Sequence, residues 1–397
     1  MEIARRIILR LDKWEYTWIC LLTLVLLALH FSFIYQPNTP LFDEQHYVPE
    51  ARAIIQEHKT LHPEHPPLGK LFIASGIVIF GDNPVGWRFF AVICGTASIF
   101  LFYLICRQLT IPRAASLLAT FLLATENLTF IQSSVAMLDV FSVTFVILAF
   151  WLYLKRYYPL AALAIALAAL TKLTGVLALP VIVLHWLIIR RDQPVHFIAS
   201  MLLAPLSFLL IMPALDFIAL RKLLDPISQL KMMLSQSATL KFSTVTHPSL
   251  SRPWEWVLLP KIMPYWYQPH YIALVSFTIW ALIIPTVAYM TFKTVKGNSA
   301  GTFGLSWFAG TYLPWIPLNL ITDRVTFIFY FYPVIGSFCI GLGMGLYQLL
   351  GLAQARQKGK LKWGIIIGIA VYLVLHLAIF VVLMPLSTWW NGAIFAK

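Results

Sequence analysis

Asp43 and Glu44 are adjacent carboxylates directly after the first apolar run of the chain. They belong to residues 36–70, which hold five acidic residues and four histidines although only 11% of the whole chain is Asp, Glu, Lys or Arg. Carboxylates near a bilayer are costly and often mark functional sites. A partly desolvated carboxylate can accept the proton of an alcohol as a general base. Alternatively, the pair is an interfacial feature neutralised by Arg52 or Lys70.

Several basic residues lie where apolar runs begin or end and could bind a phosphate. Arg88 follows Trp87 at the start of the second run, Lys172 lies in the turn TKLTG, and Arg324 precedes an aromatic stretch. Fixed positive groups stabilise charge that develops on a leaving phosphate. Each could instead extend to lipid headgroups, as long basic side chains commonly do. Together with Asp139, at the start of another run, these residues are expected to meet at one polar cavity.

His58, His62 and His65 are separated by four and three residues, a spacing that would suit zinc on a helix. Pro63 and Pro66 disfavour a regular helix there, so we expect no metal site and interpret His65 as part of a structural turn. The four cysteines fall inside apolar runs without a CxxC spacing, which indicates neither disulfides nor a thiolate metal site. They are Cys20, Cys94, Cys106 and Cys339.

Apolar runs of about 20 residues recur along the chain, which is 60% apolar with a mean hydropathy of +0.79. This composition is more apolar than that of soluble domains and predicts an all-α polytopic membrane protein. We expect one transmembrane domain over residues 1–397, without a soluble domain, and a first span that is a retained signal-anchor. The eleven predicted spans are residues 16–35, 88–106, 113–126, 139–154, 158–171, 173–189, 195–216, 271–292, 302–320, 325–349 and 363–385.

Basic residues divide unevenly between the two faces that these spans define. With the N-terminus in the cytoplasm and the C-terminus outside, the cytoplasmic segments hold 16 of the 29 basic residues and 4 of the 16 acidic ones, a net +12 against +1 outside. Positive charge favours the cytoplasmic side, so the pI near 9.6 reflects topology. Nucleic-acid binding is not expected, because no basic stretch is interleaved with exposed aromatics on a soluble domain. The cytoplasmic residues are Glu2, Arg5, Arg6, Arg10, Asp12, Lys13, Glu15, Arg107, Arg113, Lys155, Arg156, Arg190, Arg191, Asp192, Lys293, Lys296, Arg356, Lys358, Lys360 and Lys362.

Two long segments, residues 36–87 and 217–270, should lie on the outer face of the membrane. The first contains Lys70 to Gly81, an apolar run too short to span, which predicts a re-entrant or interfacial helix. The second contains a predicted amphipathic helix from Leu220 to Leu234 and an aromatic, proline-rich stretch from Ser251 to Pro269 that suits the headgroup zone. We find no internal repeat of the kind many transporters show, which disfavours a transporter.

The order of these motifs resembles that of the protein O-mannosyltransferase family, membrane enzymes of the GT-C glycosyltransferase class. The likeness covers roughly residues 40 to 335, and FDE followed by HPPLGK is its most specific part. The motifs are FDE (Phe42–Glu44), HPPLGK (His65–Lys70), Trp87-Arg88, MLD (Met137–Asp139), TKLTG (Thr171–Gly175), SRPWEW (Ser251–Trp256) and Arg324 with the aromatic stretch that ends at Pro333.

The resemblance implies a GT-C fold of about eleven spans with a cytoplasmic N-terminus. It also implies transfer of a sugar, usually mannose, from a polyprenyl or dolichyl monophosphate to a Ser or Thr hydroxyl of a protein, with inversion and without a metal or other cofactor. Asp43 would then be the catalytic base, and Glu44 would help to hold the acceptor. The donor phosphate would be bound by Arg88, Arg324 and Lys172. Supporting positions would be Asp139, His65 and Lys70.

The chain also departs from the eukaryotic pattern of the family. Residues 217–270 leave no room for the MIR domain of eukaryotic members, which favours a prokaryotic-type enzyme in the cell membrane with its site facing outside. Phe331 stands where the eukaryotic pattern carries a histidine, so the resemblance implies no role of such a histidine in this chain. Family members often pair, so a dimer is a further expectation. Two alternatives stay open: a GT-C transferase acting on a lipid or cell-wall glycan, and a lipid or sugar transporter.

Overall fold

The computed structural model describes residues 14–267, 270–355 and 359–385. Some of the residues assigned above to the cytoplasmic face lie outside these ranges, namely Glu2, Arg5, Arg6, Arg10, Asp12, Lys13, Arg356 and Lys358. The helices are α2 (Glu15–Phe33), α3 (Glu44–Glu57), α4 (Pro67–Phe80), α5 (Pro84–Gln108), α6 (Arg113–Ala124), α7 (Asn127–Ser134), α8 (Leu138–Leu154), α9 (Tyr158–Thr171), η1 (Leu173–Leu177), α10 (Ala178–His185), η2 (Trp186–Arg190), α11 (Pro194–Leu220), α12 (Pro226–Ser237), α13 (Glu255–Leu258), α14 (Phe277–Trp280), α15 (Ile283–Val295), α16 (Ser299–Tyr312), α17 (Trp315–Thr322), η3 (Ile328–Val334), α18 (Ile335–Ala355) and α19 (Lys360–Leu383); the strands are β1 (Ile262–Tyr267) and β2 (His270–Leu274).

Six helical segments of the described residues are long and apolar enough to cross a membrane, and a seventh is added if α6 and α7, bent by 60°, count as one span. Three further apolar helices, α4, α8 and α9, are shorter than 18 residues. The protein is therefore an integral, multi-pass membrane protein. Each predicted span contains helix, but the number eleven is not confirmed. The six segments are Glu15–Phe33, Pro84–Gln108, Leu173–Arg190, Pro194–Leu220, Ile328–Ala355 and Lys360–Leu383.

The all-helical prediction is wrong at one place, where β1 and β2 form an antiparallel hairpin. β2 occupies the start of the span predicted at residues 271–292, and only short α14 and α15 follow it. Alternating burial along β1 and its aromatic, β-favouring residues explain why this stretch extends instead of coiling. The amphipathic helix predicted at Leu220 begins at Pro226, because α11 continues to Leu220. The short helix predicted from Lys70 is confirmed as α4.

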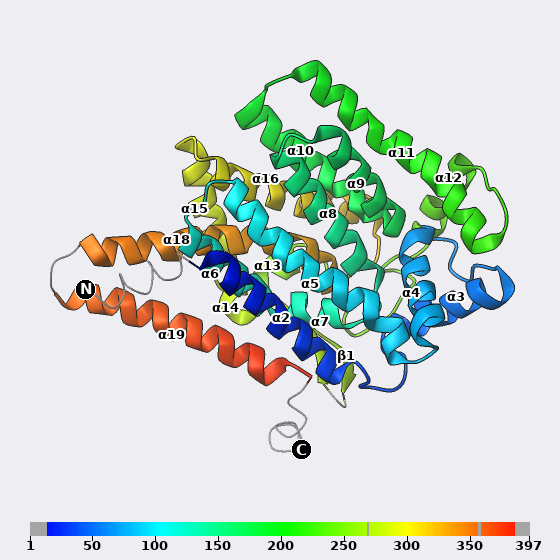
Figure 1. The fold of residues 1–397 in the computed structure, drawn as a ribbon, viewed down its shortest axis with the longest axis horizontal. Helices are drawn as coiled ribbons and strands as arrows, with labels where there is room; N and C mark the ends of the chain where they lie inside the picture. The colour runs from blue at the N-terminus through cyan, green and yellow to red at the C-terminus, as the bar shows by residue number, and fades with distance from the viewer. Residues whose placement is uncertain (1–13, 268–269, 356–358, 386–397) are drawn as a thin grey trace.

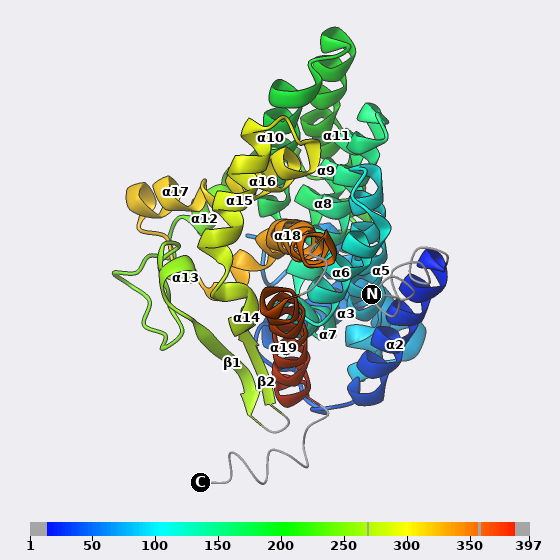
Figure 2. The same ribbon diagram turned by 90° about the vertical axis from the view of Figure 1, so that its left-hand side faces the viewer.

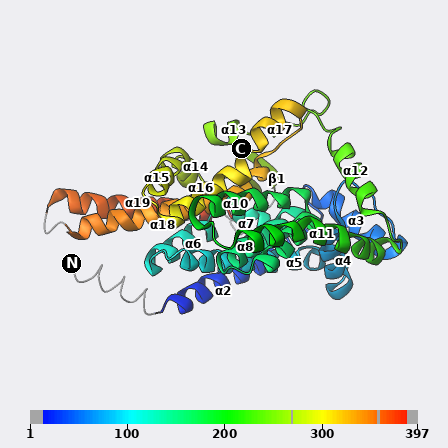
Figure 3. The same cartoon turned by 90° about the horizontal axis from the view of Figure 1, so that it is seen from above.

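The helices form a bundle in which α8 lies centrally, packed against α5 and α9, while α11 covers α9. In Figure 1, α3 and α4 lie at the right-hand end of the bundle close to α12, whereas α18 and the start of α19 lie at the left-hand end. Figure 2 shows the β-hairpin below the helices, beside α19. Seen from above, α18 and α19 run side by side, and α17 approaches α12 across the opposite end (Figure 3). The ends of the bundle thus differ in construction.

Three of the sequence motifs meet where α4 packs against α8 and α9. A Cβ added at Gly69, in HPPLGK, would lie 2.7 Å from the Leu138 side chain in MLD and 3.3 Å from the carbonyl of Thr171 in TKLTG. The absence of a side chain at Gly69 therefore allows α4 to approach closely enough to hold these two segments. Asp139 is the next residue after Leu138, and Lys172 is the next residue after Thr171, so this contact positions both residues.

Charged residues predicted to be cytoplasmic pair with one another at the turns away from α3. The Glu15 carboxylate lies 3.0 Å from Arg107 and 3.2 Å from Arg113, and Asp192 lies 3.2 Å from Arg156. Groups from separate turns can meet in this way only if those turns share one end of the bundle. That arrangement agrees with the two-faced charge distribution of the sequence, although it does not say which face is cytoplasmic.

Candidate active site

A cavity of about 990 Å³ opens between α3, the β-hairpin, the loop at residues 237–247 after α12 and the segment at residues 324–330 that leads into η3. Asp43, Lys172 and Arg324 all line it, so the structure brings one predicted carboxylate and two predicted cations together. The rest of the wall is rich in aromatic and histidine side chains, including Phe42, His46, Tyr47, His62, His65, His247, Tyr265, Trp266, Tyr267, Phe327, Phe329 and Tyr330.

Asp43 occupies the residue before α3, half-buried in the cavity wall. No group in the described part of the chain hydrogen-bonds its carboxylate. Burial raises the pKa of Asp43 to about 7; Lys172 lowers it and Asp139 raises it, but the desolvation outweighs both. A carboxylate with this pKa and no protein partner is suited to exchange a proton with a substrate near neutral pH.

Glu44 turns away from the cavity into a buried ion pair with Arg88. The two Glu44 oxygens accept from Nε and Nη2 of Arg88 at 2.8 Å each, and both side chains are fully buried. The same carboxylate accepts from the backbone N–H groups of Leu41 at 3.1 Å and Ala136 at 2.9 Å. The structure thus gives Glu44 the role of joining the start of α3 to the segment before Asp139, and leaves it no contact with a molecule in the cavity.

Arg88 is occupied in the same way. Its Nη1 donates to the carbonyls of Ile34, Gln36 and Pro37 at 2.9, 3.2 and 3.0 Å, and its Nη2 donates to that of Thr39 at 3.3 Å. A guanidinium has five N–H donors, and these contacts together with Glu44 use its whole fork. The structure therefore places Arg88 outside the cavity, holding the turn that leads to Asp43.

Asp139 and Lys172 form a second buried ion pair, with Lys172 Nζ 2.8 Å from both Asp139 oxygens. The ammonium also lies 5.2 Å from the ring centre of Phe329 and 4.9 Å from that of Tyr330. An ammonium has three donors, so one remains for a molecule in the cavity. Asp139 lies behind Lys172 and orients it.

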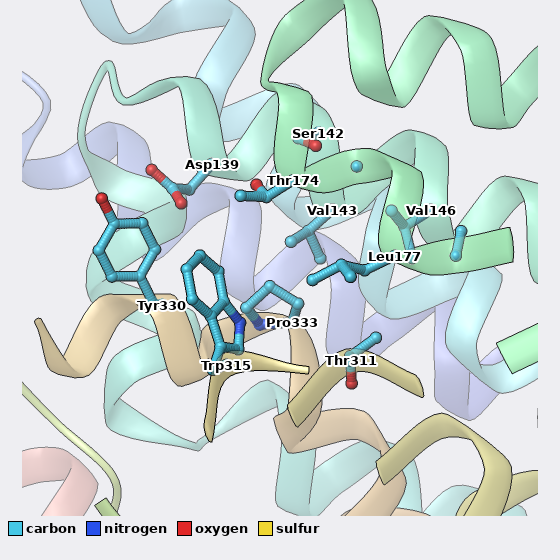
Figure 4. Close-up of a pocket in the computed structure, with 12 residues that line it drawn as sticks. Asp139, Ser142, Val143, Val146, Thr174, Leu177, Thr311, Trp315, Tyr330 and Pro333 are labelled. Atoms are coloured by element: carbon cyan, nitrogen blue, oxygen red, sulfur yellow. The ribbon is translucent and has the colours of Figure 1, made fainter. Parts of the chain in front are cut away.

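A pocket of about 20 Å³ lies on the far side of Asp139, large enough for about one water-sized sphere. Figure 4 shows Asp139 and Tyr330 at one end of this pocket, with apolar side chains such as Val143 and Leu177 filling the other. Tyr330 also lines the large cavity.

Arg324 reaches the large cavity from the segment between α17 and η3. Its Nη1 donates to the carbonyl of Ser237 at 2.5 Å, and its own carbonyl accepts from the Asn319 side chain at 2.6 Å. Arg252, in SRPWEW, fixes the neighbouring turn through a 2.8 Å ion pair with Asp323. The two long loops of the sequence are thereby connected, since α12 and SRPWEW together position this cation.

His65 and Lys70 support the wall behind Asp43. The His65 ring lies 3.4 Å from the Tyr47 hydroxyl, and burial together with Lys172 and Lys70 holds the pKa of His65 well below its usual value, so the ring is neutral. Lys70 forms a buried 2.8 Å ion pair with Glu50 and donates to the carbonyl of His62 at 2.5 Å. Lys70 thus fixes the turn before α4 without reaching the large cavity.

The remaining histidines show no arrangement suited to a metal. His62 lies 3.1 Å from Glu64, and the ring centres of His62 and His46 are 5.1 Å apart. Throughout the described ranges, no group of three or more His, Cys, Asp or Glu side chains could hold an ion.

Sequence reasoning missed Tyr265 and Tyr330 as parts of the site. Tyr265 belongs to the stretch from Ser251 to Pro269, which was interpreted as suiting the headgroup zone, and Tyr330 belongs to the aromatic stretch after Arg324, to which no role of its own was assigned. Only the positions of these two tyrosines relative to Asp43 distinguish residues of the site from other aromatic residues of the same stretches.

Comparison with known proteins agrees with the motifs. Residues 64–217 match the family described as dolichyl-phosphate-mannose-protein mannosyltransferase. The resemblance to protein O-mannosyltransferases is confirmed. The polyprenol-phosphate-mannose–protein mannosyltransferase of Mycolicibacterium smegmatis is 35% identical over 119 residues, 28% of this chain and 23% of the relative. That of Corynebacterium glutamicum is 31% identical over 162 residues, 37% of this chain and 31% of the relative. The matched segments thus span less than a third of these relatives' length.

Solved structures with the same fold cover nearly the whole chain. The protein O-mannosyltransferase Pmt1-Pmt2 complex of S. cerevisiae bound to the sugar donor matches with a TM-score of 0.71 and 12% identity, covering 94% of this chain and 90% of that one. ArnT of Cupriavidus metallidurans bound to undecaprenyl phosphate matches with a TM-score of 0.62 and 16% identity, covering 94% and 76%. At such identities the likeness concerns the fold alone.

Proposed function

We propose that the protein transfers a sugar, most simply mannose, from a polyprenyl or dolichyl monophosphate to Ser or Thr hydroxyls of proteins at the outer face of the membrane. The observation that carries this proposal is Asp43, a carboxylate that accepts no hydrogen bond from the described residues, in a cavity that also presents Lys172 and Arg324. The names of the relatives that match residues 64–217 support the donor and the acceptor class.

In the proposed reaction, Asp43 acts as the base, and Lys172 and Arg324 are the two cations. The acceptor oxygen attacks the anomeric carbon while Asp43 takes the hydroxyl proton. The bond from that carbon to the phosphate oxygen breaks, and its electron pair leaves with the lipid phosphate, which becomes a dianion. Lys172 and Arg324 stabilise this added charge because both are held in place before the reaction. A single displacement of this kind inverts the anomeric centre.

Glu44, Arg88 and Asp139 position the reacting groups in this proposal. The Glu44–Arg88 pair fixes the turn that carries Asp43, and Asp139 orients the Lys172 ammonium. This departs from the sequence-based hypothesis that Arg88 binds the donor phosphate and Glu44 the acceptor. No step of the proposed reaction uses a metal or other cofactor.

Purified protein, polyprenyl-phosphate mannose and a Ser/Thr peptide test the proposal directly. The wild type should form glycopeptide, and Asp43→Asn should lower the rate by about 10²–10⁴-fold, the usual contribution of a general base. Asp192→Asn is the matched control, because Asp192 pairs with Arg156 away from the cavity and should leave the rate unchanged. Equal rates for the wild type and Asp43→Asn would refute the base assignment.

The same assay separates the alternatives. Transfer of the sugar to a lipid or glycan, with no glycopeptide formed, would favour a GT-C transferase that acts on a lipid or cell-wall glycan. Binding or movement of the lipid without any transfer would favour a transporter.

A further inference from the structure

α12 directly follows a helix that is long and apolar enough to cross the membrane. It is joined to α11 by a short connection at residues 221–225. The last turn of α11 still exposes the apolar side chains of Phe217 and Ile218, and α12 lies beside this end of α11 (Figure 1). We therefore expect α12 at the level where the apolar core of the bilayer meets water, which is where amphipathic helices lie in the plane of the membrane.

α12 presents one apolar side to the bundle and another to its surroundings. Met233 is buried in a cluster that includes Phe208 of α11. Ile227 and Leu234 are seven positions apart and share a different side of the helix, where they are 52% and 56% exposed. Leu230 lies between these two sides, partly buried against the same cluster. The exposed apolar stripe thus continues the packed side of α12 outward from the bundle.

Basic residues border this stripe. Lys231 lies four positions after Ile227 and three before Leu234, so it is on the same side of α12. Residues 217–247 contain four basic residues and one acidic residue, Asp225, whose carboxylate accepts from the Ser228 N–H as the cap of α12. Within the described part of the chain, none of the four cations forms an ion pair. They are Arg221, Lys222, Lys231 and Lys241.

α12 is also connected to Arg324 in the large cavity. The carbonyl of Ser237, the last residue of α12, accepts from Nη1 of Arg324. Beyond α12, the carbonyl of Leu240 accepts from the N–H of Val325, the residue after Arg324. A shift of α12 would therefore move the guanidinium that lines the cavity.

We propose that α12 binds anionic phospholipids of the leaflet on the cavity side, and that this contact holds Arg324 in place. The exposed stripe of Ile227 and Leu234 enters the acyl boundary, while Lys231 and the cations of residues 221–222 contact the lipid phosphates. Each basic residue near an anionic membrane surface increases binding about fivefold. The lipid contact goes beyond the proposed function, whereas its effect through Arg324 rests on that function.

Quenching by brominated lipids tests the contact without an enzyme assay. Leu234→Cys and Ser235→Cys lie on different sides of α12, and each receives a fluorescent label after the four native cysteines are replaced. In vesicles of equal parts phosphatidylcholine and phosphatidylglycerol, the label at position 234 should be quenched strongly and the label at position 235 weakly. At position 234, brominated phosphatidylglycerol should quench about two- to fivefold more than brominated phosphatidylcholine.

Equal quenching at the two positions would overturn insertion of the apolar stripe. Equal quenching of the label at position 234 by the two brominated lipids would overturn the preference for an anionic headgroup.

Turnover tests the effect on Arg324 in protein that retains its native cysteines. At saturating lipid-linked mannose and peptide, kcat should be about two- to fivefold higher in the mixed vesicles than in phosphatidylcholine alone. The double variant Lys222→Gln/Lys231→Gln should lose this response. Lys59→Gln is the matched control and should keep it, because Lys59 pairs with Glu57 on the exposed surface.

The two measurements separate the lipid contact from the function. A wild-type kcat that is equal in both vesicles, with the quenching preference intact, would refute the coupling through Arg324. Absence of transfer in every vesicle, with the label at position 234 still quenched preferentially by brominated phosphatidylglycerol, would count against the proposed function and leave the lipid contact standing.

Discussion

At the scale of single residues, the site depends on the charge of Asp43. Its pKa of about 7 results from burial, opposed by Lys172 and assisted by Asp139. A base must be ionised to act, so kcat/KM should rise with pH through about 7 and level off above it. Lys172→Met removes the cation and leaves Asp139 unneutralised. Both changes raise the pKa of Asp43 and should move the rise in kcat/KM to higher pH.

The pH dependence of kcat/KM for peptide, measured from pH 5 to 9, checks the direction of the shift. Lys59→Met is the control, because Lys59 pairs with Glu57 on the exposed surface. If kcat/KM of Lys172→Met rises at the same pH as that of the wild type, while its rate is lower, Lys172 does not set the charge of Asp43.

Arg88 tests the distinction between a phosphate ligand and a structural clamp. Arg88→Lys keeps the charge but loses the fork that holds Glu44 and the carbonyls of residues 34–39, and each buried acceptor left without its donor costs about 1–3 kcal/mol. We expect a clear fall in the thermal unfolding temperature with polyprenyl-phosphate affinity per folded molecule unchanged.

Arg52→Lys disrupts a similar two-bond pair, with Asp82, at an exposed position. Exposed pairs contribute about 0–1 kcal/mol, so this control should lose little stability. A large loss of lipid affinity in Arg88→Lys at unchanged stability would restore the phosphate-binding role.

At the scale of elements, α4 is held by close backbone contact with α5. A Cβ at Gly76 would lie 2.0 Å from the carbonyl oxygen of Gly86, so Gly76→Ala must move one helix, at a cost of about 1–3 kcal/mol. Gly368→Ala, in α19, meets no atom within 4 Å and should be neutral or slightly stabilising. Denaturation of the two variants in the same lipid or detergent measures the difference. Equal stability would mean that α4 packs more loosely than the structure shows.

The sequence predicted those elements whose formation depends on local pattern. Long apolar runs gave α2, α5, α11 and α19 near their observed bounds. The hairpin was missed because residues 271–292 are apolar enough for a span, and only pairing with Ile262–Tyr267 makes their first part a strand. The partners of Arg88 could not be predicted either. Its contacts lie about fifty residues away in sequence, and only packing of α5 against the turn after α2 decides between a lipid phosphate and Glu44.

At the scale of the whole molecule, the charges divide the bundle into two ends. Glu15, Arg107 and Arg113 meet at the start of α2, and Asp43 follows the turn beyond its end. A helix of 19 residues spans roughly 28 Å, close to the thickness of the bilayer's apolar core. We therefore expect the cavity and the clustered cations to lie at opposite membrane faces, and the excess of basic residues in the turns predicts that the cation end is cytoplasmic.

Labelling of single cysteines in intact cells tests this orientation. Glu57→Cys, at the exposed end of α3, and Arg191→Cys, in the exposed turn before α11, are each introduced after the four native cysteines are replaced. A membrane-impermeant maleimide should label Glu57→Cys in intact cells and Arg191→Cys only after permeabilisation, because the first lies on the cavity side and the second beside Asp192 on the cation side. The reverse pattern would invert the topology and, with it, place the proposed transfer on the cytoplasmic face.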